Sequence, residues 1–225
     1  MISIGKLFVV ATPIGNYGDI SLRALDVLKN SDAIACEEFR EGSTLLKKLS
    51  LGEKKFIIMN EHNEKEGTEE VIQALLSGQS IALISDCGTP AFADPGTNLV
   101  ERCLEYGIPV SSIPGASSLM TAISLSPLPL KEFYFAGFLP RAESERREKL
   151  TFLKSLRMPI ILMDTPYRMG KLLSEIASNF GKNRLITLAV DLTMPAESVL
   201  HGTVGEILLS VKDRKGEFIL ILHSL

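Results

Sequence analysis

Short apolar runs alternate along the chain with longer segments in which apolar and polar residues repeat at helical spacing. In the first half, strands are predicted at residues 7–11, 33–36, 56–59, 81–85 and 109–113, and helices at 19–28, 44–49, 66–76 and 97–106. Strands that alternate with helices form parallel sheets with right-handed crossover connections. The fold class predicted from this pattern is therefore α/β.

The alternation is interrupted at residues 114–118, where Pro-Gly-Ala-Ser-Ser precedes an apolar helix. A domain boundary here predicts an N-terminal α/β domain with a mostly parallel sheet over residues 1–113 and a C-terminal α/β domain over residues 114–225. In the second domain, strands or apolar segments are predicted at 133–138, 159–163, 184–190, 198–202 and 217–222, and helices at 144–156, 169–180 and 204–211. Strands that are neighbours in the sequence after residue 185 predict a mixed sheet.

Composition narrows the class of protein. The 225 residues are 45% hydrophobic and 23% charged, with a formal net charge of −3, so an RNA substrate would have to be met by a local basic patch. Three cysteines, an odd number, favour a reducing compartment over a disulfide framework. No apolar run approaches the roughly 20 residues that span a bilayer, and the first residues lack a signal-peptide layout. We expect a cytoplasmic protein that acts on neither DNA nor membranes.

The segment from Ile81 to Gly96 is the most informative part of the chain. A short apolar run ends in a loop of Asp, Gly, Thr and Pro, and a second Asp-Pro-Gly precedes a helical pattern. Open α/β sheets bind ligands beyond the carboxyl ends of their strands, which favours a polar ligand such as a nucleoside. A turn-forming loop with Asp94 as a helix N-cap explains the segment equally well.

Two other loops follow predicted strand ends. The loop from Thr12 to Gly18 contains only Gly-x-x-Gly, which disfavours a nicotinamide enzyme or an ATPase. The sequence Glu-His-Asn-Glu at 61–64 lacks the second histidine of a zinc protease motif, so no metal site is predicted. The same cluster could serve substrate contacts or proton transfer, or could be a solvated loop with a helix cap.

Charged residues form two further groups. The segment Cys36–Arg40 also follows a strand and could form an ion network that faces the substrate, although a surface ion pair is the commoner explanation. Residues 141–157 contain more lysine and arginine than glutamate, a pattern that usually indicates a solvated helix face. If RNA binds, Arg141, Arg146 and Arg147 are the best candidates for phosphate contacts.

Several ordered motifs carry a resemblance to a known family. They are Val9–Asn16, Asp19–Leu25, Glu61–Glu64, Ser85–Pro90 with Asp94–Gly96, Ile113–Gly115, Gly137–Pro140 and Lys215–Phe218. Together they resemble the ribosomal RNA small subunit methyltransferase I family, which belongs to the tetrapyrrole methylase, or class III, group of S-adenosylmethionine (SAM) enzymes. The resemblance covers nearly the whole chain.

The resemblance implies two αβα domains with SAM in a cleft between them, and a homodimer. It implies methyl transfer to the 2′-hydroxyl of a cytidine in the decoding region of 16S rRNA, with the rRNA or the small ribosomal subunit as partner. Carried over by position, the SAM contacts are Pro13, Ile14, Asp86, Gly88, Thr89, Ala91, Ser117, Ser118, Met163 and Ala189.

Further residues are assigned to catalysis and to the substrate. The candidates for the base that accepts the hydroxyl proton are Glu38, His62 and Glu64, all near strand ends. The candidates for substrate contacts are Arg40, Asn63, Arg141, Arg146, Arg147 and Arg168.

The chain departs from the family pattern at three segments. Glu37–Arg40 stands where the family usually has Glu-Asp-Thr-Arg, Met163–Arg168 where it has Tyr-Glu-Ser-Pro-His-Arg, and Val190–Glu197 where it has Arg-Glu-Leu-Thr-Lys and further charges. The usual C-terminal extension is also expected to be missing. The cofactor is thus better supported than the substrate. A methylase of a small molecule such as a tetrapyrrole, and a SAM-binding homologue without catalysis, are the alternatives.

Overall fold

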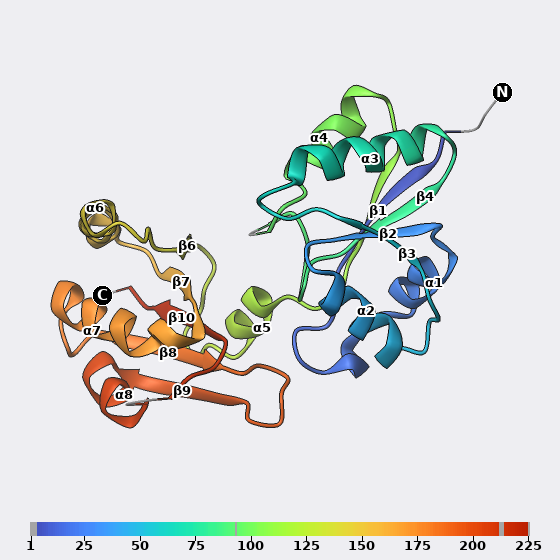
Figure 1. Cartoon of the computed structure of the whole chain (residues 1–225). Coiled ribbons are helices and arrows are strands. Elements are labelled where there is room, and N and C mark those ends of the chain that lie inside the picture. Colours follow the sequence, from blue (N-terminus) through green and yellow to red (C-terminus); the bar gives the residue numbers. More distant parts are fainter. Residues whose placement is uncertain (1–3, 93, 212–213, 225) are drawn as a thin grey trace. The chain divides into compact units, whose positions relative to one another are not determined.

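The computed structural model describes residues 4–92, 94–211 and 214–224 and forms two compact units, residues 1–117 and 118–225 (Figure 1). The division lies four residues after the boundary predicted at residue 113, where the loop that follows the last strand of unit 1 reaches a helix. The expected absence of a signal peptide depends partly on residues 1–3, which lie outside the described residues.

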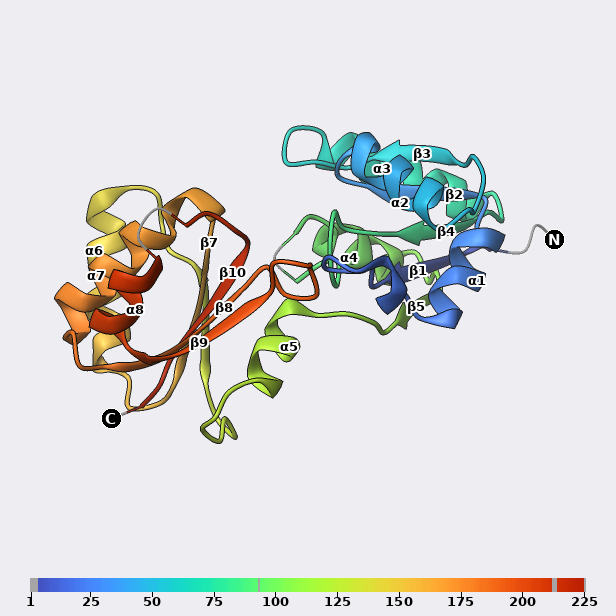
Figure 2. The ribbon, with the colours of Figure 1, turned by 90° about the horizontal axis from the view of Figure 1, so that it is seen from below.

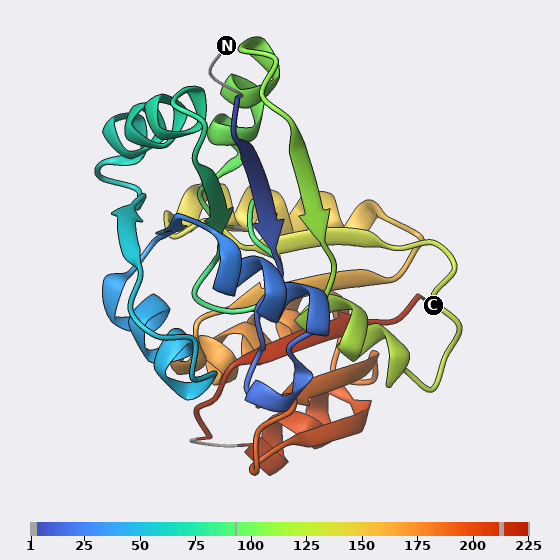
Figure 3. The same ribbon diagram turned by 90° about the vertical axis from the view of Figure 1, so that its right-hand side faces the viewer.

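Unit 1 is built on a parallel sheet. Its strands are β1 (Lys6–Val10), β2 (Ala33–Cys36), β3 (Lys55–Ile58), β4 (Ser80–Leu83) and β5 (Val110–Ile113). Their order is β3-β2-β4-β1-β5, and every neighbouring pair is parallel (Figure 3). The carboxyl ends of the five strands therefore lie along one edge of the sheet, as the alternating pattern predicted.

Helices cover both faces of this sheet (Figure 1). The helical elements are η1 (Tyr17–Asp19), α1 (Leu22–Asn30), α2 (Phe39–Lys48), α3 (Glu64–Leu76) and α4 (Thr97–Glu105). α1 and α2 pack with Val10, Ile34 and Ala82 on one face, and α3 and α4 pack on the other. Successive strand residues point to opposite faces, so the inner strands β2 and β4 are apolar and largely buried on both faces, whereas the edge strands β3 and β5 are partly exposed.

Unit 2 contains the predicted mixed sheet. Its strands are β6 (Tyr134–Phe138), β7 (Ile160–Asp164), β8 (Leu185–Val190), β9 (Ser198–Thr203) and β10 (Phe218–Leu222). Their order is β6-β7-β10-β8-β9, with β6 parallel to β7 and the remaining pairs antiparallel.

The helices of unit 2 gather mainly on one side of this sheet. They are α5 (Ser118–Ser124), α6 (Glu143–Ser155), η2 (Pro166–Arg168), α7 (Met169–Phe180) and α8 (Val204–Val211). α6, α7 and α8 form one core with Leu162, Leu188 and Leu220, whereas α5 contacts β10 from the opposite side (Figure 2). Within the described residues, no helix combines the length and the apolar character needed to cross a bilayer.

Candidate functional site

The loops after β1 and β4 are joined beyond the edge of the unit 1 sheet. The backbone N–H of Thr12 donates to the carbonyl of Gly88 at 2.8 Å, and the N–H of Gly88 donates back to the carbonyl of Thr12 at 3.2 Å. These neighbouring strands continue into helices on opposite faces, α1 after β1 and α4 after β4. Such a switch point is where open α/β sheets bind their ligands.

The loop after β5 joins the same group. The Thr89 hydroxyl donates to the carbonyl of Ala116 at 3.2 Å. A Cβ added to Gly115 would lie 3.1 Å from the Cβ of Ala11, so glycine permits the close approach of the two loops. The predicted cofactor residues Pro13, Ile14, Gly88 and Thr89 therefore sit on loops that the structure holds together.

The backbone of the β4 loop takes conformations that suit close contact with a ligand. Gly88 has φ +78°, and a Cβ there would lie 3.3 Å from Ile14 Cγ2. Ala91, another predicted cofactor residue, has φ +60°, a conformation that non-glycine residues seldom adopt. Backbone strain of this kind concentrates at functional sites. With the exposed carboxylate of Asp86 beside them, these loops offer shape, backbone groups and one charge.

The remaining predicted cofactor residues lie further along the chain. Ser117 ends unit 1, and Ser118 is the first residue of α5. In unit 2, Met163 and Ala189 both pair with Ile219, so the three side chains form one row across β7, β10 and β8. This row alternates with the leucines that contact α6, α7 and α8, and so it lies on the opposite face of the sheet.

Carboxylates are concentrated where β2, β3 and β4 end in unit 1. Burial raises the pKa of Glu37, and the nearby charges of Asp86, Asp94, Glu61 and Glu38 raise it further. The pKa of Asp86 is also above its ordinary value, because the surrounding protein removes part of its hydration and Glu41, Glu38 and Asp94 repel its charge.

Both aspartates of the β4 loop have partners that oppose this effect. A hydrogen bond from the backbone N–H of Glu38 partly offsets the rise in the pKa of Asp86. Burial raises the pKa of Asp94, which a hydrogen bond from the Ser85 side chain offsets in part. Glu37, directly after β2, was considered only as part of an ion network that could face the substrate, and Asp94 only as a helix N-cap. The N-cap of α4 is instead Gly96.

The loop after β3 holds its own polar residues in structural roles. The Asn63 side chain donates to the carbonyl of Ile58 at 3.1 Å and accepts from the backbone N–H of Asn60 at 2.8 Å. Glu64 accepts from the backbone N–H of Gly96 at 3.3 Å, which ties the start of α3 to the start of α4. His62 is exposed, and within the described residues no hydrogen bond or ion pair joins it to Glu38 or Glu64. Among the residues that the structure describes, His62 is therefore not linked to the other two predicted bases.

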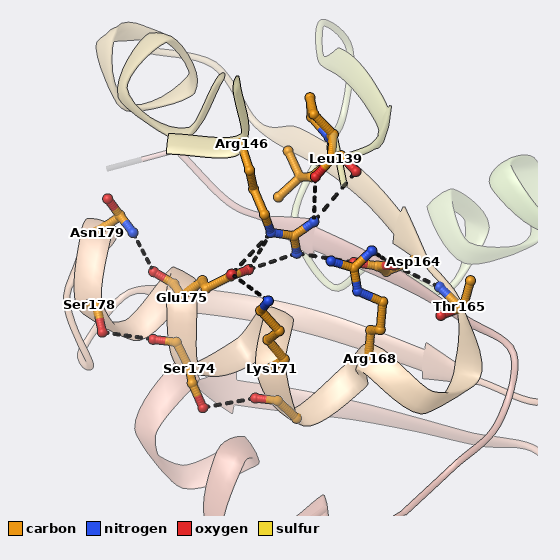
Figure 4. A network of polar contacts seen from close by, with 12 residues as sticks. Leu139, Arg146, Asp164, Thr165, Arg168, Lys171, Ser174, Glu175, Ser178 and Asn179 are labelled. Atoms are coloured by element: carbon orange, nitrogen blue, oxygen red, sulfur yellow. Dashed lines mark hydrogen bonds and ion pairs between the residues drawn. The ribbon is translucent and has the colours of Figure 1, made fainter. Parts of the chain in front are cut away.

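Arg146 occupies a place that corrects its prediction as a phosphate contact. The side chain is 3% exposed, and its guanidinium contacts Glu175 at 2.7 Å and Asp164 at 3.1 Å (Figure 4). It also donates to the carbonyls of Leu139 and Pro140 at 3.4 and 3.3 Å. Since every arm of the guanidinium is engaged inside unit 2, Arg146 holds α6 to β7 and α7.

The chain is similar to known proteins over nearly its whole length. The family model of tetrapyrrole (corrin/porphyrin) methylases matches residues 6–208. Ribosomal RNA small subunit methyltransferase I of Neisseria meningitidis is 39% identical over 223 residues, which are 97% of this chain and 76% of that protein. The chain belongs to the ribosomal RNA small subunit methyltransferase I family. The ribosomal RNA small subunit methyltransferase I of Escherichia coli O157:H7 is also 39% identical to this chain, over 99% of this chain and 79% of that protein.

The fold of this methyltransferase family also matches solved structures. Uroporphyrin-III C-methyl transferase from Thermus thermophilus, solved with S-adenyl homocysteine, superposes with a TM-score of 0.69 over 97% of each chain. At 17% identity, this likeness concerns the fold. The predicted α/β fold of the tetrapyrrole methylases is confirmed.

The other arginines that we assigned to the rRNA substrate lie on the surface. Arg40 on α2 and Arg141 before α6 are exposed. Arg147 is 76% exposed and contacts Glu143 at 3.3 Å, whereas Arg168 is 25% exposed and lies 3.7 Å from Asp164. Their surface positions are compatible with substrate contacts, which stay a prediction. Among the described residues, no group of three or more His, Cys, Asp and Glu side chains is arranged to hold a metal ion.

Proposed function

We propose that this chain transfers a methyl group from SAM to the 2′-hydroxyl of a cytidine in the decoding region of 16S rRNA. Its family membership makes it a SAM-dependent methyltransferase. The observation that carries the proposal is the switch point where the Thr12–Gly88 bridge joins the β1 and β4 loops beside a carboxylate cluster. The choice of a cytidine in 16S rRNA and of its 2′-hydroxyl is based on the resemblance of the sequence motifs to those of the family.

The residues of unit 1 fit SAM. Thr12 and Gly88 join the two loops, the absence of a side chain at Gly88 lets Ile14 pack closely against the β4 loop, and Asp86 supplies a carboxylate for a hydroxyl or ammonium group. Bound SAM supplies an electrophilic methyl group on its sulfonium sulfur. The protein's own contribution is to hold the ribose hydroxyl in line with that group, since alignment alone can remove several kcal/mol of barrier.

The carboxylates after β2 are the best placed proton acceptors. A ribose hydroxyl is a weak nucleophile, so a base within hydrogen-bond reach accelerates its attack. Glu38 was predicted for this role, and its neighbour Glu37 has a raised pKa, which makes its carboxylate the stronger base. We assign proton acceptance to the Glu37–Glu38 pair. Glu64 instead positions the β4 loop through Gly96.

The first test uses small and large ribosomal subunits that lack this modification. Labelled methyl from SAM is expected to appear in the small subunit and not in the large one, when transfer is measured by filter counting. Equal labelling of both subunits, or of neither while SAM still binds, would contradict the proposal.

Asp86→Asn is expected to weaken SAM binding and to stabilise unit 1 at neutral pH. Loss of a charged hydrogen-bond partner should raise the Kd for SAM about 10- to 100-fold, measured by calorimetry. A raised pKa means that the folded state binds a proton more tightly than the unfolded state. As the pH rises from the ordinary aspartate pKa of the unfolded chain through the higher pKa of the folded chain, Asp86 contributes less and less to the free energy of unfolding. The asparagine variant should thus melt at a higher temperature at pH 7 and like wild type at low pH.

Asp26→Asn provides the matched control for this prediction. Asp26 is exposed on α1, away from the carboxyl ends of the strands, so both SAM affinity and the pH profile of melting should stay unchanged. If Asp86→Asn lowers the melting temperature at pH 7, or leaves the Kd for SAM unaltered, the assigned role of Asp86 is wrong.

A further inference from the structure

A surface hollow of about 950 Å³ lies beside the edge strand β3 and helix α2 of unit 1. Phe39, Phe56, Ser43 and Lys47 contribute to its lining. The two rings meet edge to face with their centroids 5.1 Å apart, and Phe39 is nonetheless 57% exposed. An exposed aromatic side chain in a concave surface marks a binding site more often than a scattered apolar residue does.

A buried glycine of α2 supports one of the rings that line the hollow. A Cβ added to Gly42 would lie only 2.7 Å from the Phe56 ring, so glycine at this position lets the ring pack against the helix. Phe56 in turn supports the Phe39 ring from its edge. The exposed ring is thereby held by a rigid neighbour.

The charge around the hollow is opposite to that of the whole chain. Residues 39–56 carry five lysine or arginine side chains and two glutamates, a local net charge of +3 in a chain whose net charge is −3. Arg40, Lys47 and Lys48 are exposed. Lys54 has a structural role, because its amine donates to the carbonyls of Lys29 and Ser31 at 2.6 and 2.8 Å. Aromatic faces beside such cations are what single-stranded nucleic acid requires, stacking for bases and charge for phosphates.

One residue that lines the hollow is the direct sequence neighbour of the proposed reaction site. Phe39 follows Glu38 directly, and α2 begins at Phe39. The carboxylates after β2 would repel phosphates, so a nucleotide whose ribose lies at Glu37 and Glu38 needs its neighbours held by a different surface. The basic surface of α2 begins at the next residue.

We propose that this hollow binds an unstacked base of the rRNA substrate, stacked on Phe39, with Lys47 at an adjacent phosphate. The inference rests on the proposed function, because it takes RNA as the substrate and names the surface that holds the nucleotide next to the methylated one. It assigns to Phe39 a role in substrate positioning and none in the methyl transfer step.

The chain contains no tryptophan, so Phe39→Trp creates a single fluorescent reporter in the hollow. A short single-stranded RNA is expected to quench this fluorescence, since bases stack on indole rings. Leu209→Trp, at a 73% exposed position on α8 in unit 2, is the matched control and should not be quenched. Circular dichroism and thermal melting verify that both variants are folded.

Kinetics with small subunits provide the second readout. Phe39→Ala should raise KM for the subunit about 5- to 100-fold with kcat and the Kd for SAM within two-fold of wild type, and Phe39→Tyr should restore KM. Lys47→Gln should reduce the slope of log Kd for RNA against log salt by about 0.7, whereas Lys182→Gln, at an exposed position between α7 and β8, should not.

Several outcomes would overturn the proposal. An unchanged KM in Phe39→Ala, or no quenching of Phe39→Trp by an RNA that filter binding shows to be bound, excludes a base at Phe39. A raised KM for subunits without quenching by RNA assigns the hollow to a ribosomal protein instead. A wild-type chain that transfers no methyl to subunits contradicts the proposed function, and the fluorescence titration still decides whether the hollow binds RNA.

Discussion

Arg146→Ala is expected to lower the free energy of unfolding of unit 2 by about 3–5 kcal/mol. The substitution removes a buried cation and leaves Asp164, whose side chain is 2% exposed, and the partly buried Glu175 without their shared partner. Breaking a buried ion pair from one side is costly because the remaining charge is desolvated and unpaired. Urea unfolding followed by circular dichroism measures the loss, and hydrogen exchange over α6 and α7 locates it in unit 2.

Arg147→Ala is the matched control, because the two arginines are neighbours on α6. Arg147 is 76% exposed, and its contact with Glu143 is a surface pair, so its loss should change stability by no more than about 0.5 kcal/mol. If the two variants unfold alike, Arg146 does not hold unit 2 together as the contacts indicate.

The double variant Glu37→Gln, Glu38→Gln is expected to lower kcat for methyl transfer about 10²- to 10⁴-fold, while the Kd for SAM stays near wild type. The physical reason is the loss of the carboxylate pair that accepts the hydroxyl proton. Because the pKa of Glu37 is raised, the acidic limb of the kcat–pH profile in the wild type should lie above the ordinary glutamate pKa of about 4.3. Glu37→Gln alone should move that limb.

Glu41→Gln is the control for this experiment. Glu41 is exposed on α2 and also raises the pKa of Asp86, so its removal changes the local charge without touching the assigned base. Its kcat should remain within about three-fold of wild type. A double variant that keeps most of its kcat would exclude both glutamates and return attention to His62.

Local patterns predicted most of the strands and helices, and a few local signals were misleading. The helix predicted at 44–49 begins instead at Phe39, since Gly42 and Ser43 weaken the helical pattern while the packing of Phe56 supports it. The first helix begins after Ser21, whose hydroxyl caps it at 3.1 Å from the N–H of Ala24, and not after Asp19. The residue at which a helix begins is thus set by tertiary packing, as for α2, or by one capping side chain, as for α1.

The site was less predictable than the fold, because its properties arise between distant segments. Arg146 was assigned to phosphate contacts because its partners Asp164 and Glu175 lie 18 and 29 residues further along the chain, and only the packing of α6 against β7 and α7 brings the three together. The raised pKa of Glu37 likewise depends on burial by the folded chain and on the charges of Asp86, Asp94 and Glu61, which come from other loops. The loops assigned to the cofactor could be proposed from the sequence because each is a contiguous motif, and their contacts with SAM stay a prediction.

One measurement tests the central claim most directly. Small ribosomal subunits that lack the modification are incubated with the wild-type chain and labelled SAM, and the 16S rRNA is digested and mapped by mass spectrometry. We predict one methyl group on the 2′-oxygen of a cytidine in the decoding region, and none when the Glu37→Gln, Glu38→Gln variant is used. A methyl group on a base or at another rRNA position, or transfer to a small molecule instead of to rRNA, would contradict the account.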